Sequence, residues 1–144
     1  MISHSLADTK KLAEGFAKDL VTRGQKQGAT LVGLYGDLGS GKTAFTQIVA
    51  KFFGVEEGIT SPTFIIEKIY KTTNDLFPTF IHVDAYRLDS GDDLKKLGFD
   101  EVLKNSSNLI FLEWPERVAE ILPDHIRVVC EFVSEKERTY EIIF

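Results

Sequence analysis

Apolar positions recur along the first part of the chain at the spacing of amphipathic helices. Over residues 6–20 they repeat every three or four positions, which places them on one face of a helix. Ser5 stands where an N-cap is expected, and Gly24 follows where this helix should end. A second helix is predicted over residues 44–53, with Gly54 as its C-terminal stop.

Shorter apolar and alternating runs predict strands. Residues 31–35 form an apolar run typical of a buried strand, and residues 108–112 have the near-continuous pattern of a strand covered on both faces. Residues 64–70 and 79–86 are predicted to be two strands. The polar turn at 72–75 between them favours an antiparallel hairpin.

The second half of the chain combines short helices with a closing pair of strands. Strands at 126–133 and 138–144 are expected to pair through the charged turn at 134–137. Short helices are predicted at 92–97, 99–103 and 116–122. This order of elements fits a mixed sheet with helices on its faces. No repeat and no Pro-, Gly- or Ser-rich linker divides the chain, so we expect one domain over residues 1–144.

Composition narrows the classes of protein to consider. Acidic residues outnumber basic ones by 22 to 17, whereas a broad grip on nucleic acid needs clustered Lys and Arg. We therefore expect no DNA binding, and a role beside RNA only where another subunit holds it. Cys130 is the only cysteine, which excludes an intrachain disulfide, and we expect it to be buried. With no signal-peptide pattern and no apolar stretch of membrane length, a cytoplasmic protein without membrane contact is expected.

Residues 36–43 carry the clearest candidate chemistry, because they match the pattern G-x-x-x-x-G-K-[ST] at every fixed position. They are Gly36, Asp37, Leu38, Gly39, Ser40, Gly41, Lys42 and Thr43. Between a buried strand and a helix, such glycines let backbone N–H groups cradle phosphate oxygens. Lys42 would place a cation on the β- and γ-phosphates, and the Thr43 hydroxyl would complete a Mg²⁺ shell. We therefore predict an α/β, P-loop NTPase-like fold, with a mixed, mostly parallel sheet flanked by helices and a C-terminal antiparallel strand pair.

Two predicted strands end in carboxylates that could serve the same site. The apolar run at 108–112 finishes in Glu113, which is the form of a Walker B segment, and residues 79–83 are followed by Asp84. Ligands gather at the carboxyl ends of parallel strands, so Glu113 should point toward the Mg²⁺, directly or through water. We predict that Asp84 and Glu113 act there as metal-site and catalytic carboxylates beside Lys42. The alternative for each is a solvated residue at a strand end.

Other features leave more than one interpretation open. Residues 58–64 could be a switch segment whose hydroxyls meet the metal or the γ-phosphate, or a turn held by Pro62 with ordinary hydroxyl caps. His82 is expected to be a satisfied core or edge histidine, and Trp114 to be plain core packing. The chain contains no Asn-Lys-x-Asp element for reading guanine, which favours ATP over GTP.

Four segments together resemble the signature of the TsaE (YjeE) family of small bacterial P-loop ATPases. They are Gly-Asp-Leu-Gly-Ser-Gly-Lys-Thr at 36–43, Ser-Pro-Thr-Phe at 61–64, His-Val-Asp-Ala-Tyr-Arg-Leu at 82–88 and Leu-Glu-Trp-Pro-Glu at 112–116. The phosphate loop is generic, but the combination of the other three segments is much more specific. The resemblance covers nearly the whole chain. It departs mildly at Ser40 and Ala85, and neither replaces a group expected to touch metal or phosphate.

The resemblance implies a role in the threonylcarbamoyl modification of adenosine 37 in tRNAs that read codons beginning with adenosine. Family members work with the TsaD and TsaB proteins, of which TsaD transfers the group, and hydrolyse ATP poorly alone. Carried onto this chain, Lys42 is implied to grip the phosphates of ATP or ADP, while Thr43 and Glu113 hold Mg²⁺. Asp84 is implied to assist the metal or the attacking water. Thr63 resembles a switch residue at the nucleotide, and Trp114 is implied to matter for the site or the partner surface.

Two alternatives to a weak, partner-dependent ATPase stay open. A small-molecule kinase would pass the γ-phosphate to a metabolite, but no insertion is long enough for an obvious arginine-bearing lid. A nucleotide-gated binding module with incidental hydrolysis would use the same binding site, so the sequence does not separate it from an ATPase. No residue is an evident arginine finger, which agrees with weak turnover by the chain alone.

Overall fold

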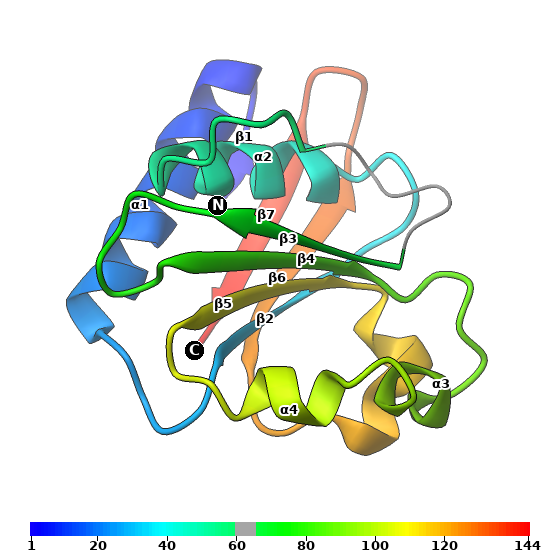
Figure 1. Ribbon diagram of the computed structural model, residues 1–144. Coiled ribbons are helices and arrows are strands. Elements are labelled where there is room, and N and C mark those ends of the chain that lie inside the picture. The colour runs from blue at the N-terminus through cyan, green and yellow to red at the C-terminus, as the bar shows by residue number, and fades with distance from the viewer. Residues whose placement is uncertain (60–65) are drawn as a thin grey trace.

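A mixed β-sheet forms the centre of the molecule (Figure 1). The computed structural model describes residues 1–59 and 66–144. In this part of the chain the sheet has seven strands in the order β1-β7-β6-β2-β5-β4-β3. The strands are β1 (Ile2–Ser3), β2 (Thr30–Tyr35), β3 (Glu67–Lys71), β4 (Thr79–Asp84), β5 (Asn108–Glu113), β6 (Ile126–Phe132) and β7 (Arg138–Ile143). Strands β6, β2, β5 and β4 pair in parallel, whereas β1, β7 and β3 pair antiparallel at the two sides.

Helices cover both faces of this sheet. They are α1 (Leu6–Arg23), α2 (Lys42–Phe52), α3 (Gly91–Lys95), α4 (Phe99–Leu103) and the 3₁₀ helix η1 (Pro115–Ile121). Figure 1 shows α1 and α2 on one side of the sheet and α3 and α4 on the other. Two apolar clusters match these two sides, one under α1 and α2 and the other under α3, α4 and η1. The predicted α/β class, with a parallel centre and a C-terminal antiparallel pair, is confirmed.

The apolar runs of the central strands are explained by burial on both faces. Val32 and Leu34 of β2 belong to the cluster under α1 and α2, whereas Leu31 faces the other cluster. Phe16 of α1 lies 5.5 Å from the Phe45 ring of α2, between ring centroids. Complete burial of such a side chain contributes about 1.5–3 kcal/mol, so this layer fixes α2 on the sheet.

The ends of α1 follow the predicted capping chemistry. The Ser5 hydroxyl accepts a hydrogen bond from the Asp8 N–H at 3.1 Å. At the other end Gly24, with φ 72°, donates its N–H to the carbonyls of Leu20 and Val21. These contacts satisfy backbone groups that a helix terminus leaves without partners, which is why the predicted helix has the observed bounds.

Several other predictions are confirmed and a few need correction. Both antiparallel hairpins form as expected, β3 with β4 and β6 with β7. The strand predicted to reach residue 86 ends at Asp84, and the helix predicted at 116–122 is a 3₁₀ helix over 115–121. Residues 64–65 of the predicted strand 64–70 lie outside the described residues.

Cys130 is buried, as expected. In the described part of the chain, no helix combines the length and apolar character that a membrane span needs.

Candidate functional site

The glycine-rich segment 36–43 lies between the carboxyl end of β2 and the start of α2. Gly36 and Gly41 have φ values of 141° and 104°, a region that side chains disfavour. A Cβ atom at Gly36 would collide with the carbonyl oxygen of Cys130, and one at Gly41 with the Tyr140 hydroxyl. The Ser40 N–H donates to the Asp37 carbonyl at 3.1 Å, which tightens the turn. The first turn of α2, which has no side-chain cap among the described residues, thus lies directly after the loop, where a helix terminus attracts anions.

Lys42 is a buried cation at the mouth of this loop, with only 5 % of its surface exposed. Its Nζ donates to the carbonyl of Gly36 and lies 3.8 Å from the centroid of the Trp114 ring. Burial lowers the pKa of Lys42, while the carboxylates of Glu113 and Glu116 oppose that shift. The ammonium group of Lys42 therefore contacts the backbone of the loop and lies near acidic side chains.

The two predicted carboxylates come together at neighbouring strand ends. Glu113 closes β5 and is paired in register with Asp84 of β4 on one side and Leu34 of β2 on the other. Glu113 is buried, whereas Asp84 is half-buried and accepts the Tyr86 N–H at 2.9 Å through Oδ1. Burial raises the pKa of Asp84; the hydrogen bond from Tyr86 opposes this shift and the charge of Glu113 adds to it. Both acids thus lie at the carboxyl ends of their strands, the same end of the sheet at which β2 leads into the loop.

His82 makes a contact that the sequence did not indicate. It is fully buried, as a core histidine should be, but its Nε2 lies 2.7 Å from Oε2 of Glu113. In the sheet His82 lies opposite Phe111, two residues before the Glu113–Asp84 pair on both strands. Side chains two residues apart share a face of a strand, so register brings the imidazole to the carboxylate. Only the pairing register of β4 with β5 could have revealed this.

Trp114 does more than fill the core. Its ring packs against the apolar cluster under α3, α4 and η1, as expected, but the ring also lies beside Nζ of Lys42 and 5.1 Å from the Tyr86 ring. Its φ of 59° is the only positive value at a non-glycine residue in the part of the chain described. Such a conformation costs roughly 1–3 kcal/mol and persists where the surroundings enforce it. The strain coincides with the turn from Glu113 into Pro115.

The side chains at the loop fit a metal that is held mainly by phosphates. Within residues 1–59 and 66–144, no group of three or more His, Cys, Asp and Glu side chains could hold an ion by itself. Mg²⁺ in nucleotide sites, however, takes one or two carboxylates together with phosphate oxygens and waters. Glu113 and Asp84 are carboxylates of that kind, and the Thr43 hydroxyl adds a neutral oxygen. Ser40 Oγ, buried beside Gly36, has no partner among the described atoms and so leaves hydrogen-bonding capacity at the loop. Thr63, the predicted switch residue, lies outside the described residues.

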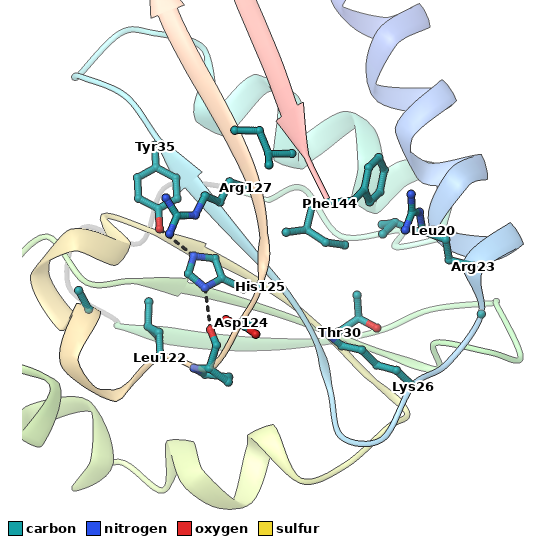
Figure 2. A pocket seen from close by; sticks show the side chains of 15 residues that line it. Leu20, Arg23, Lys26, Thr30, Tyr35, Leu122, Asp124, His125, Arg127 and Phe144 are labelled. Atoms are coloured by element: carbon teal, nitrogen blue, oxygen red, sulfur yellow. Dashed lines mark hydrogen bonds between the residues drawn. The ribbon is translucent and has the colours of Figure 1, made fainter.

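One cavity lies beside the loop and another by the start of β6. One of about 410 Å³ borders the loop and is lined by Gly41 and Ala44 together with the N-terminal residues Ser3, Ser5 and Thr9, and with Tyr140. The other, of about 700 Å³, lies by the start of β6 (Figure 2). There His125 Nδ1 donates to the Pro123 carbonyl at 2.8 Å, so its Nε2 accepts from the Tyr35 hydroxyl at 2.7 Å. Only the first cavity shares residues with the loop.

Fold and loop together define the class of protein. A mostly parallel sheet, with a glycine-rich segment between a central strand and the helix that follows it, is the P-loop NTPase-like fold. The chain belongs to the TsaE family, because the family model described as "Threonylcarbamoyl adenosine biosynthesis protein TsaE" matches residues 3–141. The resemblance seen in the four sequence segments is thereby confirmed.

Known relatives match along most of their length. The chain is 39% identical to the tRNA threonylcarbamoyladenosine biosynthesis protein TsaE of Rickettsia felis, over 99% of this chain and 78% of that protein. It is 35% identical to the protein of the same name from Bacillus subtilis, over 93% of this chain and 75% of the relative. The crystal structure of Bacillus subtilis YdiB superposes with a TM-score of 0.69 at 28% identity, covering 97% of this chain and 80% of that one.

Proposed function

We propose that this protein binds ATP with Mg²⁺ at residues 36–43, hydrolyses it weakly alone, and supports threonylcarbamoylation of tRNA adenosine in the cytoplasm with TsaD and TsaB. The observation that carries the proposal is the convergence of a buried cation, Lys42, with two strand-end carboxylates, Asp84 and Glu113, at one glycine-rich loop. Membership of the TsaE family supports the pathway.

Each side chain has a role that its surroundings favour. Lys42 binds phosphate oxygens, for which it exchanges its bond to the Gly36 carbonyl. Thr43 and Glu113 hold the metal, which, when bound, neutralises phosphate charge. Asp84 orients the attacking water or assists the metal. Because burial raises the pKa of Asp84, this carboxylate accepts a proton more readily than an ordinary aspartate would.

The cavity beside Gly41 and Ala44 is our candidate for the nucleoside part of ATP. It adjoins the loop, and its volume of about 410 Å³ lies within the range of small-molecule pockets. Its outer wall includes Ser3, which β1–β7 pairing places beside Arg138 and whose hydroxyl oxygen lies 2.6 Å from that of Thr9. The phosphate tail would then run from this cavity toward Lys42.

Single-turnover hydrolysis of γ-labelled ATP tests the proposal. Wild-type protein is expected to release labelled inorganic phosphate slowly, and Lys42→Ala to lose nucleotide binding as well as release. Asp84→Asn is expected to keep nucleotide binding and to reduce phosphate release by about 10²–10⁴-fold, which is the scale of general acid–base contributions. Glu113→Gln is expected to keep binding of metal-free ATP and to weaken its Mg²⁺-dependent binding together with phosphate release. Label that appears on a small molecule instead would favour a kinase.

The same variants separate an ATPase from a nucleotide-gated binding module when they are tested for support of tRNA modification. An ATPase role requires that Glu113→Gln and Asp84→Asn both fail to support tRNA modification. If these two variants support modification fully while Lys42→Ala does not, hydrolysis is incidental and the binding-module alternative replaces our proposal.

A further inference from the structure

A buried side-chain contact with no role in the proposed function joins His82 to Glu113. The Nε2–Oε2 distance is 2.7 Å, and the side chains are 0% and 4% exposed. A buried carboxylate needs hydrogen-bond donors, since water does not reach it. The ring of His82 reaches one of the two carboxylate oxygens of Glu113 and leaves the other, Oε1, outside this bond.

The two ring nitrogens of His82 indicate where its proton lies. Carboxylate oxygens only accept hydrogen bonds, so the nitrogen facing Glu113 carries the hydrogen. Nδ1 is buried and has no partner among the described atoms. An unpaired lone pair at Nδ1 is better tolerated there than an unpaired N–H group. The arrangement therefore favours one ring hydrogen, held at Nε2 and donated to Glu113.

We propose that His82 is a positioning residue for the nucleotide-bound metal. By holding Oε2 of Glu113, it fixes the rotation of the carboxylate so that Oε1 is presented to Mg²⁺ at the loop. The inference rests on the proposed binding of Mg²⁺ and ATP. Its physical basis is general, because outer groups that orient metal ligands by hydrogen bonds change metal affinity by about 10–100-fold. The neighbouring Asp84 is oriented in another way, by the Tyr86 N–H.

The test compares three variants by Mg²⁺-dependent nucleotide binding, followed by the emission of Trp114, the only tryptophan. His82→Leu removes the donor and keeps an apolar side chain. His82→Gln restores a donor on a flexible side chain. His125→Gln is the matched control, because it removes a histidine from a hydrogen-bonded pair in the cavity by the start of β6, away from the loop.

We expect His82→Leu to raise the Mg²⁺ concentration for half-maximal binding of Mg–ATP by about 10–100-fold. Affinity for ATP in EDTA should change by less than about threefold, and His82→Gln should recover most of the Mg²⁺ dependence. Nitrogen-15 spectra of the wild-type ring should show the hydrogen on Nε2. His125→Gln should leave all binding values unchanged.

Three outcomes would overturn the inference. A folded His82→Leu protein with wild-type Mg²⁺ dependence would show that Glu113 needs no such orientation. Equal weakening of ATP binding with Mg²⁺ and with EDTA would show a general structural role. A spectrum with the hydrogen on Nδ1 would show that His82 does not donate a hydrogen bond to Glu113. If the wild type shows no Mg²⁺-dependent nucleotide binding, the proposed function itself fails. If the wild type binds Mg–ATP and only the His82 variants depart from expectation, the inference about His82 fails alone.

Discussion

At the scale of single residues, the local sequence determines the geometry of the loop at 36–43, whereas the pairing register of the strands determines which other side chains meet there. Gly36, Gly41 and Lys42 occupy the places that the motif predicts, because the motif encodes backbone geometry over eight neighbouring residues. Asp84 and Glu113 could also be placed, since strand ends are visible in the apolar pattern. The contact of His82 with Glu113 could not be predicted, because the sequence does not show in which register two strands pair.

Gly36→Ala should destabilise the fold by about 1–3 kcal/mol or more, because the new Cβ adopts a disfavoured φ and meets the Cys130 carbonyl. Urea unfolding measures the change. Gly15→Ala is the matched control: Gly15 lies in α1, with nothing within 4 Å of an added Cβ, and alanine should stabilise the helix by about 0.5–1 kcal/mol. Equal effects at the two positions would contradict the described loop geometry.

Asp84→Asn should stabilise the protein at neutral pH while it impairs hydrolysis. Burial raises the folded-state pKa of Asp84, so the ionised side chain favours unfolding once pH rises through that pKa. Below about pH 3 both states are protonated and the two proteins should be equally stable. Asparagine keeps the Oδ1 acceptor for the Tyr86 N–H.

Unfolding free energies of wild type and Asp84→Asn from pH 3 to pH 7 measure this difference. The variant should gain stability over wild type as pH rises. A wild type that instead gains stability relative to the variant would reverse the sign of the pKa shift.

At the scale of elements, capping and apolar periodicity predicted most of the helices and strands, and the exceptions have physical causes. The 3₁₀ helix η1 replaces an α-helix because the non-helical Val118 (φ −129°, ψ 22°) interrupts regular winding, whereas Pro115 at the first position is compatible with a helix start. Strand β1 has only two residues and exists through its pairing with β7, so it carries no periodic signal. Helix α2 begins at Lys42 rather than residue 44, since the loop ends directly in its first turn.

Ser5→Ala should cost about 0.5–2 kcal/mol of stability, because α1 loses the side-chain acceptor for the Asp8 N–H. Thermal and urea unfolding would detect this. Thr22→Ala near the other end of α1 removes only a bond to the Lys18 carbonyl in the same helix and should stay within about 0.5 kcal/mol of wild type. If Ser5→Ala left the free energy of unfolding unchanged, the cap would contribute nothing to stability.

At the scale of the whole molecule, the candidate site is assembled by the topology. The ends of β2, β4 and β5 lie side by side because these strands pair in parallel, and α2 returns across one face of the sheet from the loop (Figure 1). The α/β class and the family were evident from the sequence for the same reason, since loop, strand ends and helix follow a fixed order. The cavity beside the loop could not be located from the sequence, because its lining joins residues 3–9, 41–44 and 135–140, which lie far apart along the chain.

The weak turnover that we propose for the chain alone leads to a prediction about its assembly. An arginine supplied to the γ-phosphate by a partner raises rates by roughly 10³–10⁵-fold in related chemistry. Addition of TsaD and TsaB should therefore raise ATP turnover more than tenfold, as measured by phosphate release at saturating ATP. Turnover that stays unchanged when complex formation is complete would remove partner activation from the account.

Titration calorimetry of the isolated protein with Mg²⁺ and ATP tests the central claim most directly. The account predicts saturable binding of one nucleotide by wild type, and at least a tenfold loss of affinity in Lys42→Ala, because a buried charge-assisted contact to phosphate disappears. No measurable binding by folded wild-type protein, or equal affinity in the two proteins, would contradict it.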